Sequence, residues 1–371
     1  MKDDCTAMAR GLTIGLDLGD KYSTLHVLSS EGELLDEGRV RTTQEALKAR
    51  FSGFPQSRVA IEVGTHSPWV SRLLAECGHE VLVANPRRLR LIYENDRKDD
   101  KVDAEYLARI ARLDPKLLAP IEHRTLQTQK HLTMIRARDA LVRARSRLIN
   151  LVRSSVKSVG GRLRGANPDN FHRKVVDDLP KELREGLSGV LEAIGCLNAK
   201  ITECDKRVEE VSNLKYPQTR RLRQVKGVGP LTALAFVLIL EDPRRFKKSR
   251  DVGAYLGLVP RKSQSGDRDP QLGITKAGDT LLRRLLVNCA QYIMGPFGED
   301  SDLRRHGEKI AKSKNAAQGN KNAKKRAVVA VARKTSVLLH RLWCSEEDYE
   351  PLRNTRKREA RAKGRMVTSS K

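Results

Sequence analysis

The sequence has few of the features that mark secreted, membrane or zinc proteins. Its six cysteines are scattered over 371 residues and form no CxxC pair. We therefore predict reduced, mostly buried thiols, with neither disulfides nor a zinc site. The longest uncharged apolar run, residues 227–240, is too short and too rich in glycine to span a bilayer, and the first residues, MKDDCTAMAR, lack a signal-peptide core. These absences predict a cytoplasmic protein with no membrane partner.

Acidic residues are scarce relative to basic ones. The chain has 72 Lys and Arg against 46 Asp and Glu, which gives a net charge of +26. Because the two signs are interspersed, the excess is expected on folded surfaces and not in one basic tail alone. Such an excess calls for a polyanionic partner, and nucleic acid is the default. The length allows two or three domains, each with its own core.

Residues 1–122 alternate between strand and helix patterns. Three strands separated by short turns form a predicted β-meander, at 12–18, 23–28 and 33–40. A helix, a strand, a second helix and a final strand follow, at 43–51, 58–63, 67–77 and 80–84. This order predicts a ribonuclease H-like α/β layer.

Two carboxylates, Asp17 and Glu62, interrupt strands that are otherwise apolar. A buried acid is costly unless it is paired or bound to a metal, so both indicate a cation site. Asp100 and Asp103 open the next predicted helix and share one face, although acids there are also favoured simply by the helix dipole. The four carboxylates together could hold Mg²⁺ or Mn²⁺, which would polarise a phosphate and activate an attacking hydroxyl.

Residues 123–216 predict a long helical section. Its first helix is apolar on one side and carries six arginines elsewhere: Arg136, Arg138, Arg143, Arg145, Arg147 and Arg153. These arginines either keep the helix soluble or line a nucleic-acid groove. The scarcity of balancing acids favours the groove, with Arg143 and Arg147 as candidates. A second helix, 181–214, forms with the first either an antiparallel hairpin or an intersubunit coiled coil.

Residues 217–345 predict a mostly helical C-terminal domain. Its GVGP segment between helical runs resembles a helix-hairpin-helix, in which exposed backbone N–H groups bind phosphate without reading sequence, so Lys226, Gly227 and Gly229 are candidate nucleic-acid contacts. Residues 346–371 form a basic tail. From residue 353 it holds eight Lys or Arg and one acid, and we expect it to be disordered in isolation and to contact nucleic acid.

A hydroxyl-rich loop lies between two apolar helices of this domain. Pro260 and Gly266 disfavour helix, so the apolar helical run from Ala254 to Val259 is predicted to end at Pro260 and to leave Ser265 on an irregular, accessible segment. A serine beside glycine is most often part of a turn. Here, however, cations that could hold and polarise a phosphodiester surround it, namely Arg261, Lys262, Arg268 and Lys276. Ser265 is therefore a candidate nucleophile.

Six segments, taken in order, carry a family resemblance: GLDLGDKYS, AIEVGTHS, NPRRLR, KDDKVDAEYLA, KGVGPLTA and GLVPRKSQSGDRDPQLGITKAGDTLLRRLLVNCA. They resemble the DEDD-type insertion-sequence transposases that are related to the Piv DNA invertases. These transposases are insertion-sequence family one hundred and ten. The resemblance runs from Leu12 to Trp343, and the paired KxDxxDA and SG…KAGD…LRRLL signatures are specific together. Asp99, in place of a small polar residue, and the second hydroxyl at Ser263 depart from the family pattern.

The resemblance implies a RuvC-like ribonuclease H fold for the N-terminal domain, with an acidic tetrad formed by Asp17, Glu62, Asp100 and Asp103. It also implies that Ser265 is the nucleophile, and that a structured guide RNA from the element pairs with donor and target DNA. A homodimer or homotetramer is expected on nucleic acid. Two other classes stay open from the residues: a metal-dependent junction resolvase or nuclease that uses water as nucleophile, and a non-catalytic nucleic-acid-binding protein.

Overall fold

The computed structural model describes residues 11–85, 100–264, 266, 272–312 and 321–368. The chain divides into two compact units, Met1–Thr125 and Leu126–Lys371. The predicted division of the second unit into a helical section, a C-terminal domain and a basic tail stays a prediction. Among the helices that the structure describes, none is long and apolar enough to cross a membrane.

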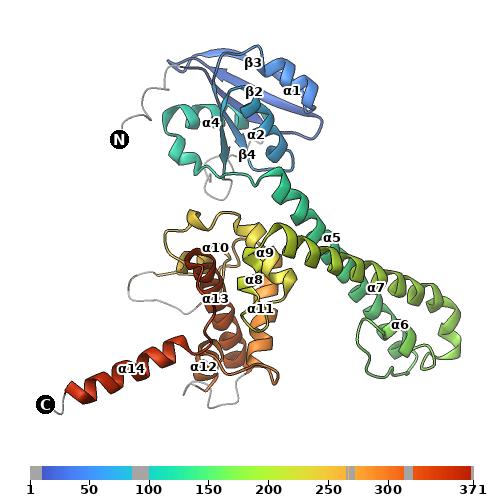
Figure 1. The fold of residues 1–371 in the computed structure, drawn as a ribbon. Coiled ribbons are helices and arrows are strands. Elements are labelled where there is room, and N and C mark those ends of the chain that lie inside the picture. Colours follow the sequence, from blue (N-terminus) through green and yellow to red (C-terminus); the bar gives the residue numbers. More distant parts are fainter. Residues whose placement is uncertain (1–10, 86–99, 265, 267–271, 313–320, 369–371) are drawn as a thin grey trace. The chain divides into compact units, whose positions relative to one another are not determined.

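A five-stranded mixed sheet is the centre of the first unit (Figure 1). Its strand order is β3-β2-β1-β4-β5; β2 is antiparallel to β1 and β3, whereas β4 is parallel to β1 and β5. The bounds are β1 Thr13–Asp17, β2 Tyr22–Leu28, β3 Leu34–Arg41, β4 Arg58–Glu62 and β5 Glu80–Ala84. The predicted meander and the order of strands and helices are confirmed, because alternating apolar residues are a local signal that each strand carries by itself.

Helices cover both faces of this sheet. They are α1 Gln44–Phe51, α2 Ser67–Glu76 and α4 Asp100–Leu113, followed by the short 3₁₀ helix η1 Pro115–Leu118. Ile14 and Ile61 belong to the cluster that buries α1 and α2, whereas Ala60 packs with Leu107 and Ala111 of α4. Successive residues of a strand point to opposite faces, so the small residues of β1 and β4 lie on the α4 side.

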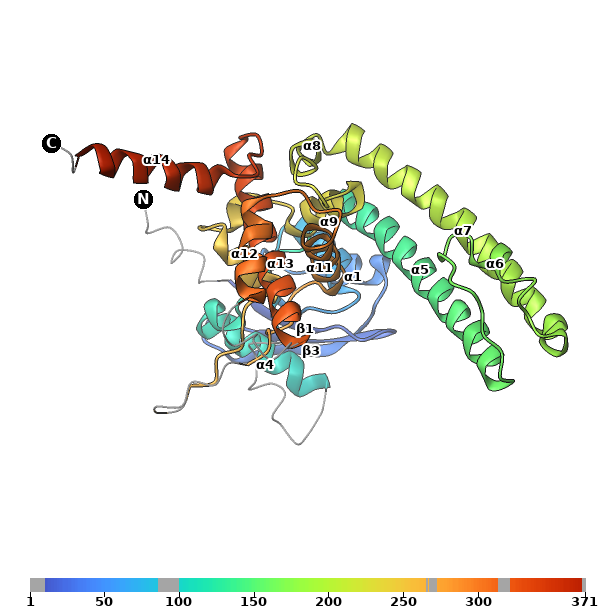
Figure 2. The same cartoon turned by 90° about the horizontal axis from the view of Figure 1, so that it is seen from below.

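The second unit begins with two long antiparallel helices, α5 Leu126–Ser158 and α7 Lys181–Lys215, seen side by side in Figures 1 and 2. Arg138 of α5 donates to Asp205 of α7 at 2.6 Å, and Arg145 donates to Asn198 at 2.7 Å. Within this chain the two helices thus form the hairpin, one of the two predicted arrangements. Near its tip, the short helix α6 Phe171–Lys174 closes a small apolar cluster.

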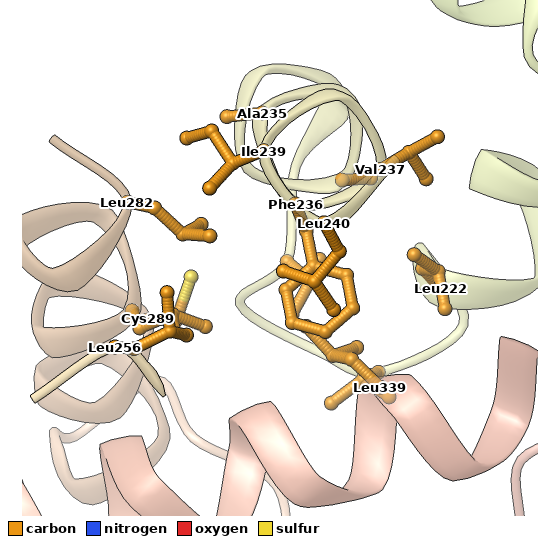
Figure 3. Close-up of a cluster of buried hydrophobic side chains, with 14 of the residues drawn as sticks. Leu222, Ala235, Phe236, Val237, Ile239, Leu240, Leu256, Leu282, Cys289 and Leu339 are labelled. Carbon is orange, nitrogen blue, oxygen red and sulfur yellow. The ribbon is translucent and has the colours of Figure 1, made fainter. Parts of the chain in front are cut away.

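The rest of the second unit is helical and packs around α9, whose residues from Thr232 to Leu240 are all buried. Figure 3 shows Phe236 and Leu240 of α9 pointing toward Leu339 of α13. The elements are α8 Gln218–Leu222, α9 Pro230–Leu240, η2 Pro243–Arg245, α10 Arg250–Tyr255, α11 Thr280–Met294, α12 Asp302–Ala311, α13 Lys321–Ser345 and α14 Arg353–Thr368. A helix that is apolar on every side is expected at the centre of a bundle, because none of its faces meets water.

Three expectations are corrected. Residues 353–368 of the tail, predicted to be disordered, form α14, and the Asp302 carboxylate accepts hydrogen bonds from the backbone N–H groups of Asn354 and Thr355 at the start of that helix. The helix before the serine loop ends at Tyr255, ahead of Gly257, and does not reach Pro260. The five described cysteines are free, as predicted, but only Cys289 is buried.

Candidate active site

Asp17 and Glu62 are the last residues of two neighbouring parallel strands, β1 and β4. Leu16 pairs with Ile61, so the two carboxylates leave the sheet side by side at the same edge. Asp17 comes two residues after Gly15 in β1, and Glu62 comes two residues after Ala60 in β4. Both of these small residues face α4. The alternation of strand side chains therefore places both carboxylates on the α4 face.

Helix α4 approaches this face unusually closely because Gly15 has no side chain. A Cβ atom added to Gly15 would lie 1.9 Å from the carbonyl oxygen of Ala104 and 2.6 Å from the backbone nitrogen of Ala108. The first turn of α4 carries Asp100 and Asp103. Contact between the α4 backbone and β1 thus brings these two acids toward the carboxyl ends of β1 and β4.

The electrostatics of Asp17 reflect this gathering of acids. Its pKa is raised from 3.8 to about 6, first because burial disfavours the ionised form and then because Asp100, Asp103 and Glu62 repel its charge. A backbone hydrogen bond from Leu18 opposes the rise. The other three predicted carboxylates, from one strand and one helix, therefore all act on Asp17 at the carboxyl ends of β1 and β4.

The four carboxylates fit a divalent metal ion chemically. Mg²⁺ and Mn²⁺ prefer carboxylate oxygens, and a cation would neutralise the repulsion that raises the Asp17 pKa. Within the described part of the chain, no three His, Cys, Asp or Glu side chains are drawn together as ligands of one ion.

A histidine lies at the same edge of the sheet. His66 follows β4, and its Nδ1 accepts a hydrogen bond of 3.1 Å from the Trp69 indole. The other ring nitrogen, Nε2, lies 3.5 Å from Oδ1 of Asp20, which follows β1. The indole bond selects the tautomer with hydrogen on Nε2, so His66 is held as a donor toward Asp20.

The serine loop belongs to the second unit. Ser265 and Arg268 lie outside the described residues, as does Asp99 in the first unit. The described ends of the loop form a hairpin neck: Pro260 bridges Ile274, and the Arg261 N–H donates to Gly273 at 2.9 Å. Ser263 and Lys262 are exposed beyond this neck. The neck holds the described ends of the loop together.

Two glycines close the base of the neck. Gly257 has φ of +68°, and a Cβ there would lie 2.2 Å from the carbonyl oxygen of Ala277; Gly278 has φ of +74°, and its Cβ would lie 2.0 Å from the carbonyl oxygen of Tyr255. The exposed Lys276, between them, also has a positive φ of 56°. Only glycine adopts such conformations at little cost while letting two backbones touch. The KAGD segment thus joins α10 to α11 rigidly.

Two residues of this joint were not singled out from the sequence. Asp279 caps α11 by accepting a hydrogen bond of 2.9 Å from the Leu282 N–H. Arg283 donates to the carbonyl oxygens of Ala277 at 2.7 Å and Leu256 at 3.0 Å. The signal for Asp279 was present, since an Asp directly before an apolar helix is a common cap. Nothing local marked Arg283, because its acceptors precede α11.

Most arginines of α5 are engaged within the protein. Arg136, Arg138, Arg143 and Arg145 pair with acids, and Arg153 stacks on the Phe171 ring. Arg147 is exposed and makes no salt bridge to an acid within the described residues. The predicted arginine groove is thus largely a set of intramolecular contacts, with Arg147 and the outer side of Arg143 left facing solvent.

The GVGP segment forms a turn between α8 and α9. Gly227 has φ of +91°, and the exposed Gly229 caps α9 without a side-chain hydrogen bond. The first N–H groups of α9 therefore lack a side-chain acceptor from their cap. Lys226 pairs with Glu299 at 3.2 Å, and both side chains are largely exposed.

Two family models assign the chain to the DEDD transposases, which are DNA-acting enzymes whose domain implies a general dependence on divalent metal. Residues 14–160 match the DEDD transposase family model, and residues 219–302 match the model of the transposase IS116/IS110/IS902 family. The chain belongs to the IS110 family of transposases.

Three relatives are similar over much of their length. A transposase for insertion sequence element IS1328 from Yersinia enterocolitica is 30% identical over 286 residues, covering 76% of this chain and 83% of the relative. A probable family 20 transposase from Pseudomonas aeruginosa is 28% identical, and the match covers 91% of this chain and 98% of the relative. A transposase for insertion sequence element IS1111A from Coxiella burnetii is 27% identical, over 91% and 90% respectively.

Proposed function

We propose that this transposase cuts and rejoins DNA by attack of the Ser265 hydroxyl on a phosphodiester, assisted by Asp17, Glu62, Asp100 and Asp103 of a RuvC-like domain. The observation that carries the acidic part is the electrostatic coupling of the other three acids to Asp17. The serine part is supported by the bridge between Pro260 and Ile274 at the described ends of the loop and by the exposed Arg261 and Lys262 of that loop. The evolutionary link to the Piv invertases belongs to the same proposal.

The four acids would hold Mg²⁺ or Mn²⁺, which, when bound, lowers the pKa of a nearby hydroxyl and neutralises phosphate charge. In the serine step, the Oγ–P bond forms while the P–O bond to one DNA end breaks. The serine proton leaves and the departing DNA oxygen gains one, so protons balance. A DNA hydroxyl then reverses the step on the phosphoserine. Because the link conserves the bond energy, rejoining needs no ATP.

Several surfaces would hold the nucleic acid. Cations near the neck, Arg261, Lys262, Arg268 and Lys276, would contact the phosphates about the cut. The turn formed by Lys226, Gly227 and Gly229 resembles a helix-hairpin-helix, whose open N–H groups suit a phosphate. Arg143 and Arg147 would contact the backbone elsewhere on the hairpin of α5 and α7.

We further propose that a structured RNA encoded beside the gene guides this reaction by pairing with donor and target DNA. The net charge of +26 supports a large polyanionic partner. We expect a dimer or tetramer on nucleic acid, assembled through residues 128–214. Sequencing of the RNA that copurifies with the protein tests the first idea, and RNA-free protein that recombines at full rate would remove it. Mass photometry showing only active monomers would remove the second.

The deciding experiment separates serine chemistry from water chemistry. Ser265→Ala is expected to abolish both DNA cleavage and the covalent protein–DNA adduct while leaving binding intact. Asp17→Asn and Asp103→Asn should do the same, because they remove metal ligands. Ser263→Ala is the matched control and should stay active. The readout is a denaturing gel of protein with labelled DNA, with and without Mg²⁺.

The alternative is a metal-dependent resolvase or nuclease of the RuvC type. It shares the acids but needs no serine. Cleavage by Ser265→Ala at the normal rate, with the acidic variants inactive, would establish water as the nucleophile and favour this alternative. A protein that only binds nucleic acid would show no cleavage with any metal.

A further inference from the structure

A large groove lies at the foot of the serine hairpin, in the second unit. Its volume is about 1430 Å³, and its walls come from the hairpin neck, α12, α13 and the start of α14. The neck contributes Leu258, Pro260 and Ile274. The lining residues of the groove on α13 run from Asn322 to Arg341, so the groove follows much of this helix. Figure 1 shows α13 beside α10 and α12. The groove is therefore continuous with the segment that carries the proposed nucleophile.

The lining of the groove is strongly basic. Six of its cations make no salt bridge to an acid among the described residues: Arg250, Lys325, Arg326, Arg333, Lys334 and Arg341. Only two acids line it, and one of them, Asp302, already accepts hydrogen bonds from the start of α14. These six cations are thus not held in salt bridges among the described residues, in contrast to the paired arginines of α5.

The spacing of these cations suits a polymer of phosphates. Arg326, Arg333 and Arg341 are seven and eight residues apart on α13, or roughly 11 Å at the rise of an α-helix. A row of cations at such intervals can contact several phosphates of one backbone. Half-buried apolar residues such as Val329 and Val337 lie between them and offer a surface for the sugars.

The field in the groove is positive. The pKa of Lys334 is lowered, first by burial and then by Arg358, and Asp302 only partly opposes this. The pKa of His306 is lowered likewise, first by burial and then by Lys334 and Lys309. An anion in the groove would relieve this mutual repulsion.

We propose that this groove binds the phosphate backbone of the DNA that enters the serine hairpin. The inference rests on the proposed function, because the hairpin neck forms one wall of the groove and DNA is what the serine would attack. The six cations would hold the strand, so the groove would position DNA without taking part in bond breaking.

The test uses full-length, nucleic-acid-free protein carrying Ser265→Ala, so that no cutting occurs. Lys325→Ala with Arg326→Ala removes two exposed groove cations. Affinity for a short fluorescein-labelled DNA duplex of mixed sequence is followed by anisotropy over a range of salt. Loss of two phosphate contacts should weaken binding roughly five- to tenfold at about 0.15 M salt and reduce the salt slope by about 2.

Matched variants exclude trivial explanations. Lys48→Ala with Arg50→Ala removes the same charge from the exposed side of α1 in the first unit and should bind DNA like the parent. Lys325→Arg with Arg326→Lys keeps the charges and should retain affinity. Equal melting temperatures show that the fold is intact. Unchanged DNA affinity in the groove variant, or an equal loss in the α1 variant, would overturn the proposal.

An RNA duplex of the same sequence tests whether the groove binds DNA or RNA. A loss for RNA equal to or larger than that for DNA overturns the assignment to DNA. The outcome is separable from the serine proposal, because binding is measured without cleavage. A groove variant that binds normally beside an inactive Ser265→Ala protein leaves the serine chemistry standing. Cleavage by Ser265→Ala removes the serine chemistry whatever the groove binds.

Discussion

Gly15 of β1 lies directly against Ala104 of α4: a Cβ on the glycine would be 1.9 Å from the alanine carbonyl oxygen. No side chain fits there, so the helix that carries two of the four acids can approach the strand that carries a third. The lack of a side chain at Gly15 therefore allows the acidic site to assemble. Adding a methyl group at this position tests that role.

Gly15→Ala should destabilise the first unit by about 2 to 3 kcal/mol, because the new methyl group meets backbone atoms that cannot turn away. It should also lower DNA cleavage, since α4 must shift. Gly38→Ala is the control: it lies in β3 with no atom within 4 Å of the added Cβ and should change stability by less than about 0.5 kcal/mol. Thermal unfolding followed by circular dichroism measures both. Equal melting temperatures would contradict the close contact.

Asp17→Asn should make the protein more stable at neutral pH in the presence of EDTA. The folded-state pKa is about 6 against an ordinary 3.8, so folding holds the proton more tightly. The wild type therefore loses stability as the pH rises from about 4 to about 6, and stays lower above that range. Because Asp17 is partly in contact with water, we expect a difference of about 1 to 2 kcal/mol.

Urea unfolding of both proteins between about pH 4 and pH 7.5 measures this difference, which should vanish at the acidic end. Asp20→Asn is the control, because it makes the same substitution at an exposed carboxylate outside the four proposed metal ligands. Added Mg²⁺ should stabilise the wild type but not Asp17→Asn, since binding to the folded state alone raises its stability. A wild type that is as stable as Asp17→Asn in EDTA at neutral pH would refute the electrostatic reading.

Gly257→Ala should disable the serine hairpin. The residue would have to keep a left-handed φ of +68° with its Cβ 2.2 Å from the Ala277 carbonyl oxygen, which we expect to cost about 3 kcal/mol. The neck would open and covalent DNA adducts would be lost. Gly273→Ala, on the opposite strand of the neck with no atom within 4 Å, should keep most of the activity. A denaturing gel compares the two, and an active Gly257→Ala protein would show that the joint is not needed.

Arg145 and Arg147 of α5 should behave oppositely. Arg145 is buried and donates to Asp169 at 2.5 Å and Asn198 at 2.7 Å, so Arg145→Ala should cost about 2 kcal/mol of stability. Arg147 is exposed, and Arg147→Ala should leave stability unchanged while weakening nucleic-acid binding a few-fold. Melting curves and anisotropy separate these effects. A stability loss in Arg147→Ala, or none in Arg145→Ala, would contradict the assignment.

Much of the acidic site could be predicted from the sequence because its signals are local. Asp17 and Glu62 interrupt strands that are otherwise apolar. Each carboxylate therefore stands out within its own strand, without knowledge of the neighbouring strand. The predicted role of Ser265 is different, since it falls outside the described residues and stays a prediction.

The tertiary structure decided the contacts between distant parts of the chain. The sequence could not tell that Arg138 pairs with Asp205, that Asp302 caps the helix starting near Arg353, or that α4 touches Gly15. In each case the partner lies tens of residues away, so no local pattern encodes the pairing. By itself the sequence determined the strands, helices and charge of this transposase; the tertiary structure decided which charges are neutralised internally and which remain available for nucleic acid.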